Sequence, residues 1–313
     1  MRILRAVHYG ALSAVIWCST ARASEVGEAV AAVLDRRNSG MVQNEAQVRL
    51  SAFPAEEVID EVAPFIEAEE RRYRLAAVWV LELPPYARTE EGTVLLLNVL
   101  KDEDAAMRSA AAAGLRHASP SLEKTVVEEL TVKVRDEDST RVLISVIRTI
   151  GALGYDASAR EALLDAAGDV NNLPLVFWAL SENEGLGEAM KALREADRWR
   201  SPVRLPGKPQ HEIATMLQAE VYRSPEAVEF VLGDRELLDA IFALANGAAE
   251  EAGGRSAAMR TVLLLALHEE KQGQGGEVRA QELLDRVQPR SEQVKQEWAR
   301  LRSSWAQALN RKE

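Results

Sequence analysis

The chain has 313 residues, of which 47% are hydrophobic and only 5% aromatic, and its formal net charge is −11. Alanine, leucine, valine and glutamate are its commonest residues, which favours helices packed through small and aliphatic side chains and argues against an all-β sandwich. The acidic charge would repel the phosphates of a nucleic acid. We therefore expect a helical protein without a nucleic-acid partner.

Residues 1–23 have the pattern of a signal peptide. Arg2 and Arg5 form a basic start, an apolar run covers residues 11–18, and Ala21 and Ala23 place small side chains three and one residues before the expected cleavage site. The run is shorter than the roughly 20 residues that a helix needs to cross a bilayer, so no transmembrane segment is expected after cleavage. An N-terminal core helix is the alternative. We expect an exported protein, periplasmic or secreted.

The sequence offers little for catalysis. Cleavage would remove Cys18, the only cysteine, and with it any disulfide, thiolate ligand or cysteine nucleophile. The three histidines outside the expected signal peptide, His117, His211 and His268, are far apart in the sequence. HExxH, P-loop, dinucleotide-binding and GxSxG motifs are absent. We expect no catalytic residue, no metal and no cofactor.

A repeat runs through residues 54–179. Each copy reads as an apolar helix, an acidic turn and a second helix that opens near an arginine, and these arginines, Arg74, Arg108 and Arg141, are 34 and 33 residues apart. One helix pair cannot cover its own apolar faces, so neighbouring pairs must stack. We predict an all-α fold: an α-solenoid of helix pairs followed by a C-terminal helical region. The fourth and last copy has Leu175 at the arginine position.

The stretch LLLNVLKDEDAAMRSAAAAGL, residues 95–115, resembles the HEAT-repeat family and its short bacterial variants, with a looser echo over residues 130–153. In that family the turn aspartate and the second-helix arginine form a ladder between successive repeats. The resemblance implies that Asp102 or Asp104 and Asp136 or Asp138 face Arg108 and Arg141. The acidic turn before Arg141 is one residue shorter than the others. The candidate ladder or partner-binding residues in the repeat are Arg74, Arg108, Arg141, Asp104 and Asp138.

Residues 201–210 contain three prolines and a glycine, which predicts a break between helical regions. We therefore divide the chain into a signal peptide at 1–23, a repeat domain at 24–200, a linker at 201–210 and a C-terminal region at 211–313. The helices expected in the last region are 212–223, 225–252, 256–271, 278–287 and 291–311, with breaks at Gly253-Gly254 and residues 273–276. The expected helix starts are Ser158 with Glu161, Ser119-Pro120 and Ser224-Pro225.

Tryptophans are the remaining candidates. In the last helix an apolar stripe follows spacings of four and three residues along one face: Val294, Trp298, Leu301, Trp305 and Ala308. The stripe either packs on the preceding helix as a cap or docks into a partner's groove or a second copy, which makes Trp298 and Trp305 candidate partner-binding residues. Trp79 and Trp178 take comparable places in their repeats and are expected in the core.

These features favour a non-catalytic scaffold, because stacked repeats create extended surfaces that bind other proteins. An accessory factor for assembly or folding of an envelope complex is the first alternative. A hydrolase or lyase that uses carboxylates converging in the concavity of the solenoid is the second.

Overall fold

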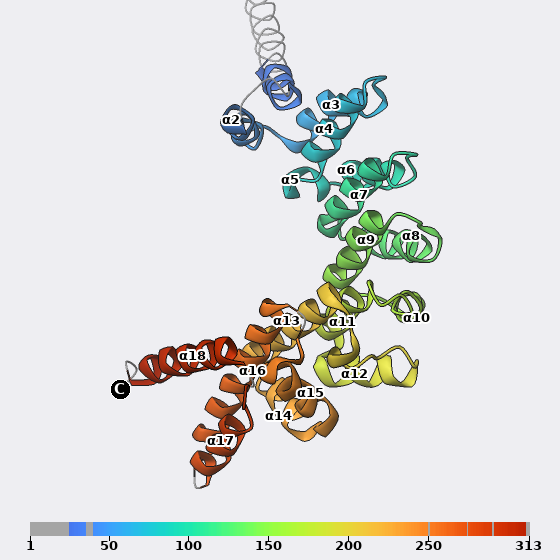
Figure 1. The fold of residues 1–313 in the computed structure, drawn as a ribbon. Coiled ribbons are helices and arrows are strands. Elements are labelled where there is room, and N and C mark those ends of the chain that lie inside the picture. Colours follow the sequence, from blue (N-terminus) through green and yellow to red (C-terminus); the bar gives the residue numbers. More distant parts are fainter. Residues whose placement is uncertain (1–24, 36–39, 250, 274, 290, 311–313) are drawn as a thin grey trace, which may run out of the picture. The chain divides into compact units, whose positions relative to one another are not determined.

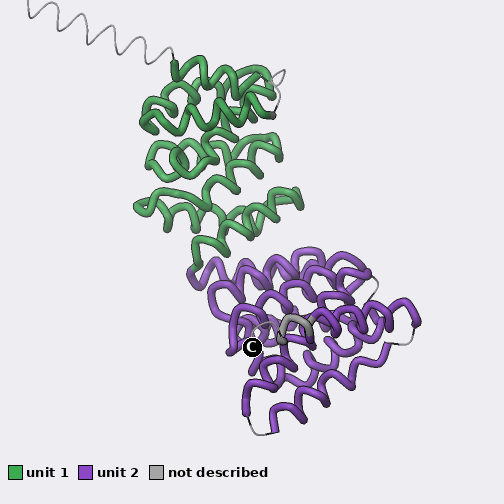
Figure 2. Tube along the Cα trace, turned by 90° about the vertical axis from the view of Figure 1, so that its left-hand side faces the viewer, with its two compact units in different colours: residues 1–155 green, residues 156–313 purple. Residues whose placement is uncertain are grey.

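The computed structural model describes residues 25–35, 40–249, 251–273, 275–289 and 291–310, and every regular element within them is a helix (Figure 1). The predicted all-α class is confirmed. The expected signal peptide at 1–23 lies outside these residues. Among the helices that are described, none combines the length and the apolar composition needed to cross a membrane. The chain divides after Tyr155 into two compact units (Figure 2).

Unit 1 is a stack of helix pairs. It opens with a helix over residues 25–34. The helices that follow are α2 (Gly40–Leu50), α3 (Ala55–Val62), η1 (Ala63–Glu67), α4 (Arg71–Leu81), α5 (Pro84–Ala87), α6 (Glu90–Val99), α7 (Ala105–Gly114), η2 (Leu115–His117), α8 (Glu123–Asp136) and α9 (Thr140–Leu153). We call α3, α6 and α8 the first helices and α4, α7 and α9 the second helices, because each first helix packs against the second helix that follows it.

The second helices lie side by side, so that α7 packs against α4 on one side and α9 on the other. Ala111 and Ala112 of α7 are fully buried there, and such small side chains let helix axes approach closely. The buried Thr149 hydroxyl of α9 donates to the carbonyl of Ala112, 2.6 Å away. Burial of the second helices by their neighbours makes unit 1 a solenoid of helix pairs, as the repeat period predicted.

Unit 2 begins with further pairs and ends as helices grouped around α16. Its helices are α10 (Ala157–Ala166), α11 (Leu173–Glu184), α12 (Leu186–Glu195), η3 (Pro202–Arg204), α13 (Gly207–Arg223), α14 (Pro225–Gly233), α15 (Arg235–Ala243), η4 (Leu244–Ala248), α16 (Ala252–Lys271), α17 (Gly276–Asp285) and α18 (Glu292–Asn310). The long helix α16 packs against α13, α14, α15, α17 and α18. In α11, Leu175 is buried where the earlier repeats have an arginine.

The division at Tyr155 differs from the expected boundary at 201–210. Pro202 lies in η3, while Pro209 lies in the first turn of α13, where a backbone N–H has no intrahelical partner to lose. The buried amide of Gln210 also donates to the carbonyl of Pro202, at 3.1 Å. The segment is therefore folded into unit 2, because its prolines occupy the positions that a short helical turn and a helix start tolerate.

The single helix expected over 225–252 is wrong, because the chain turns at Asp234. The carboxylate of Asp234 accepts a hydrogen bond from the backbone N–H of Leu237 and so caps α15. The expected break at Gly253-Gly254 is also absent, since both glycines lie inside α16. A Cβ at Gly253 would come within 2.6 Å of the His211 ring of α13, so the missing side chain allows α13 and α16 to pack closely.

Among the expected helix starts, only Ser224-Pro225 is confirmed, with the Ser224 hydroxyl accepting from the N–H of Ala227. Asp156 rather than Ser158 caps α10. The backbone N–H of Ser119 donates to the buried Thr93 hydroxyl in the turn before α8, which begins at Glu123. Aspartate is as good a cap as serine, so sequence spacing alone could not choose between them.

Gly92 gives a stability test of the packing in unit 1. A Cβ at Gly92 in α6 would lie 2.1 Å from the carbonyl oxygen of Tyr86, so backbone must move to admit it. We expect Gly92→Ala to lower the free energy of unfolding by about 1–3 kcal/mol, the usual cost of overpacking, in urea titrations. Gly233→Ala is the control, because a Cβ there meets nothing within 4 Å. Equal effects of the two substitutions would contradict this account.

Candidate functional site

The acidic turn between α6 and α7 is held by two arginines of the preceding second helix. Arg74 Nη1 lies 3.3 Å from Asp102 Oδ2, and Arg71 pairs with Asp104. The same carboxylates also order the turn: Asp102 accepts from the N–H of Asp104 at 2.7 Å, and Asp104 accepts from the N–H of Ala106 at 2.8 Å and caps α7. The hydrogen bonds from Arg71 hold the pKa of Asp104 below its usual range. Each aspartate therefore joins one repeat to the next.

Arg108 forms the next rung, with a partner that differs from the expected aspartates. It binds Glu137 through two hydrogen bonds, Nε to Oε2 at 2.9 Å and Nη2 to Oε1 at 2.6 Å, and it donates to the carbonyls of Asp102 and Glu103 in its own turn. The Glu137 side chain is only 3% exposed, and its carboxylate also accepts from the N–H of Ser139. The hydrogen bonds from Arg108 lower the pKa of Glu137.

The ladder does not continue to Arg141. The shorter turn before α9 leaves Asp136 and Asp138 exposed on either side of Glu137, whose longer side chain reaches Arg108 instead. Arg141 is exposed, and within the described part of the chain neither its guanidinium nor the Asp138 carboxylate forms an ion pair. The structure therefore brings Arg74, Asp104 and Arg108 into one network and leaves Arg141 and Asp138 outside it.

Charge is divided between the two helix layers of unit 1. The second helices carry six arginines and no acidic residue. The first helices carry ten acidic residues and three basic ones. Of all the described α-helices with ten or more residues, only α4, α7 and α9 lack an acid. Since the whole chain is acidic, with a net charge of −11, these helices depart strongly from its average composition.

Most of these arginines are neutralised by neighbours, but those of α9 are not. Arg71, Arg74 and Arg108 pair with the turn acids described above, and Arg72 pairs with Glu70 at 2.5 Å. Arg141 and Arg148 are exposed and have no ion pair with any described residue. They lie seven residues apart in α9, which places them on one side of the helix. We call the exposed side of α9 that carries Arg141, Arg148 and Ala152 the α9 face.

The tryptophans divide between core and surface. Trp298 of α18 is 7% exposed beside the buried Val294, on a helix that packs against α16, so this part of the stripe serves the core. The side chain of Trp305 lies outside the described residues. Trp79 of α4 is 41% exposed, so its expected place in the core is wrong. The exposed indole of Trp79 adds apolar surface to α4.

A cavity of about 540 Å³ in unit 2 is lined by carboxylates from the α11–α12 and α13–α14 turns. Burial raises the pKa of Glu220, while the nearby Arg223 lowers it. Arg223 also lies 2.9 Å from Glu182, whose side chain is 40% exposed, so one guanidinium joins the buried and the exposed carboxylate. The arrangement places one acid in a poorly solvated position and gives it a charged neighbour.

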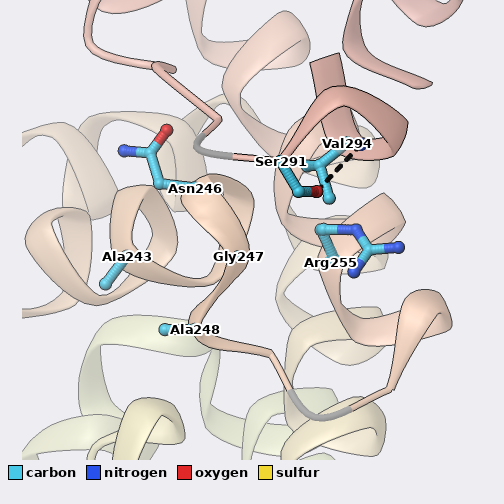
Figure 3. A pocket seen from close by; sticks show the side chains of 7 residues that line it. All are labelled: Ala243, Asn246, Gly247, Ala248, Arg255, Ser291 and Val294. Carbon is cyan, nitrogen blue, oxygen red and sulfur yellow. Dashed lines mark hydrogen bonds between the residues drawn. The ribbon is translucent and has the colours of Figure 1, made fainter. Parts of the chain in front are cut away.

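A second cavity of about 520 Å³ lies between η4 and the start of α18 (Figure 3). Ser291 caps α18 through the N–H of Val294, and Arg255 at the cavity wall binds Glu297 at 3.0 Å. Gly247, with φ +109°, lies inside the π-helical turn η4. Arg255, the charged residue in the wall of this cavity, is therefore already paired with Glu297. Among the described residues no group of three or more His, Cys, Asp or Glu side chains could hold a metal ion.

The sequence interpretation missed Glu137 and Arg148. Glu137 is one acid among three successive ones, and only the fold shows which of them turns inward. Arg148 lies one helical heptad after Arg141, and the signal for it was the absence of acids from three segments of an acidic chain. Counting charge by segment would have identified both the paired and the unpaired arginines as a group.

Comparison with known proteins does not assign a family. A scan against protein-family models found no match, and neither did a search of curated proteins. Among solved structures, the crystal structure of an engineered protein is similar at 16% sequence identity and a TM-score of 0.43, over 88% of this chain and 77% of that one.

Removing Arg108 tests the energetic weight of the ladder. Arg108→Met removes two hydrogen bonds from the Glu137 carboxylate and leaves Lys133, 3.7 Å away, as its remaining cation. Loss of hydrogen bonds to a charged group typically costs about 1.5–3 kcal/mol in the free energy of unfolding. The control is Arg72→Met, which breaks a pair whose side chains are more than half exposed and should cost at most about 1 kcal/mol. Urea titration of both variants measures the difference. A similar cost for both would show that the ladder is only a surface feature.

The Arg108–Glu137 pair also predicts a pH dependence. Because the pKa of Glu137 is lower in the folded state than in the unfolded chain, its contribution is complete above the ordinary glutamate pKa of about 4.3 and is lost as the pH falls through the folded value. The stability difference between the wild type and Glu137→Gln should therefore be largest near pH 7 and shrink in acid. A stability difference that does not change with pH would contradict this prediction.

Glu220 should behave in the opposite way. Its folded pKa is raised, so the ionised form is disfavoured by folding, and stability falls as the pH rises above about 4.3. We expect Glu220→Gln to have a higher melting temperature than the wild type at pH 7, with the difference vanishing below about pH 4. Glu226→Gln is the control in the same cavity, since the Ser224 hydroxyl lowers the pKa of Glu226 and its removal should give no gain.

Proposed function

We propose that this chain is an exported, non-catalytic scaffold of HEAT-like repeats that binds another protein through the exposed side of its second helices. The observation that carries the proposal is the acid-free layer formed by α4, α7 and α9. In a chain whose net charge is −11, a layer of three adjacent helices without one acid is a surface that can attract groups the rest of the chain repels.

The ladder supports the same proposal. Arg74 and Arg108 are tied to neighbouring turns, and Arg108 uses both the carboxylate of Glu137 and two backbone carbonyls. Bidentate hydrogen bonds between an arginine and a carboxylate fix geometry as well as adding energy. Second helices held in register this way present a preformed surface, and a preformed surface loses less conformational entropy on binding.

The export part of the proposal rests on the N-terminal sequence alone. A basic start, a short apolar run and small residues before position 24 are the elements of a cleavable leader. The HEAT-like part rests on the turn and arginine pattern of residues 95–115 together with the stacked helix pairs. An accessory factor for envelope assembly would use the same surface, with transient binding.

A hydrolase or lyase is the second candidate, and one observation favours it: Glu220 has a raised pKa and lines a cavity with Glu182. A carboxyl group whose pKa is moved toward neutrality is suited to general acid catalysis. Arg223 forms ion pairs with both carboxylates and lowers the pKa of Glu220, which works against that role. The scaffold is therefore the better-supported proposal.

Site-specific photo-crosslinking in the native cell tests the scaffold function. A crosslinking amino acid at Ala152, exposed on α9, should capture a discrete partner protein. The same amino acid at Val132, 52% exposed on the first helix α8, is the matched control and should capture it weakly or not at all. Capture at neither position, or equal capture at both, would contradict a scaffold that works through its second helices.

A further inference from the structure

Among the second helices of unit 1, the α9 face is where positive charge is left without a counter-charge. Each arginine of the other two second helices has an acid: Asp104 for Arg71, Glu70 for Arg72, Asp102 for Arg74 and Glu137 for Arg108. Arg141 and Arg148 have none among the described residues, and α9 contains no acid of its own.

The elements packed against α9 do not supply the missing charge. Within unit 1, α9 contacts α7, α8 and η2. Helix α7 has no acid, and none of the four acids of α8 forms an ion pair with Arg141 or Arg148. The Glu137 carboxylate beyond the end of α8 is committed to Arg108 and Lys133. Asp138 is exposed three residues before Arg141, and η2 adds a further cation, Arg116. Glu82 is half-buried, and the charge of Arg116 acts on its carboxylate rather than on that of an α9 neighbour.

The surface between the two arginines is neutral and partly apolar. Ile144 and Ser145 lie between Arg141 and Arg148 and are half-buried, while Ala152 follows them and is exposed. The Ser145 hydroxyl is 2.9 Å from that of Ser109 in α7, so this stretch is fixed to its neighbour. The two unpaired guanidinium groups, one on either side of this neutral stretch, can each bind a carboxylate at one end of a short segment.

We propose that the α9 face binds an acidic, extended segment of a partner protein, with one carboxylate at Arg141 and another at Arg148. This inference rests on the scaffold function proposed above and names the chemistry of its ligand. Seven residues of helix place the two arginines about 10 Å apart at 1.5 Å per residue. A peptide extended as a polyproline II helix, with three residues per turn and a rise of about 3.1 Å, covers nearly that distance in three residues and brings every third side chain to the same side. Acids at every third position of the partner segment therefore match the two arginines.

Charge complementarity decides between this occupant and others. The first helices carry ten acids and the chain as a whole is acidic, so a long polyanion such as nucleic acid would be repelled wherever it extended past α9. A short acidic segment touches only the basic layer and avoids that repulsion. Its binding should weaken as salt is added, because both arginines are exposed to solvent.

The test uses the purified full chain and a fluorescein-labelled peptide of repeated Glu-Ser-Ser, with a Gln-Ser-Ser peptide as the uncharged control. Fluorescence anisotropy should show binding of the glutamate peptide alone. The double variant Arg141→Gln with Arg148→Gln should weaken it about fivefold or more, the effect of losing two exposed ion pairs. Arg141→Lys with Arg148→Lys keeps the charge and should retain most of the affinity.

The matched control removes the same charge elsewhere. Arg260 and Arg300 of unit 2 are exposed and have no ion pair with any described residue, so Arg260→Gln with Arg300→Gln should leave peptide binding unchanged. Equal losses in the two double variants would reduce the effect to net charge and overturn the proposal. So would tighter binding of single-stranded DNA through the same arginines, or dimerisation of the wild type that the Arg141/Arg148 variant abolishes.

The two proposals fail in different ways. If the peptide does not bind but crosslinking at Ala152 still captures a partner, the acidic ligand is wrong and the scaffold stands. If the peptide binds but no partner is captured in the cell, the chemistry of the α9 face is right and the scaffold is wrong. Circular dichroism of the double variant guards against unfolding, which is not expected because both arginines lie outside the ladder.

Discussion

The structure of unit 1 depends on the lateral burial of α7 between α4 and α9. A helix pair on its own would leave Ala111 and Met107 of α7 in water, and both are completely buried once the neighbours are in place. The cost of this arrangement is that the polar ends of the second helices are brought together as well. Arg108 therefore needs the carboxylate of Glu137 and two turn carbonyls, because a buried guanidinium without partners would offset much of the gain from apolar burial.

A similar device reappears in unit 2. Asp234 caps α15 through the N–H of Leu237 and also binds Arg194 of α12 at 2.6 Å, much as Asp104 caps α7 and binds Arg71 of α4. One carboxylate thus ends a turn, starts a helix and joins it to an earlier one. From α13 onward the packing changes, since α13, α14, α15, α17 and α18 all pack against α16.

Much of the fold could be predicted from the sequence, since apolar spacing and the recurring arginines placed the helix pairs of residues 54–179 correctly. The details that failed depend on contacts distant in sequence. Glu137, between two exposed aspartates, is the acid of its turn that reaches Arg108, and Gly253 lies inside α16, where its missing side chain makes room for the His211 ring of α13. Asp234 had the composition of a cap, but the apolar pattern on both sides of it concealed the turn.

The candidate surface was predicted only in part. Arg141 was expected to act within the ladder, and its interest now lies in being left out of it, together with Arg148. No local motif marks these two residues. What distinguishes them is the composition of whole segments, which becomes informative only when the fold places those segments in one layer.

The separation of charge in unit 1 has a consequence for encounters in solution. The two unpaired arginines of α9 in one layer, and ten acids against three bases in the other, give this unit an electric dipole moment directed from the first helices toward the second. At low ionic strength, the electric field of the unit acts on a negatively charged molecule before the two make contact. The interaction of the two charges turns the unit so that its positive side faces that molecule. The orientation of an approaching partner is thus biased while the molecules are still separated by water, even though the protein as a whole repels it.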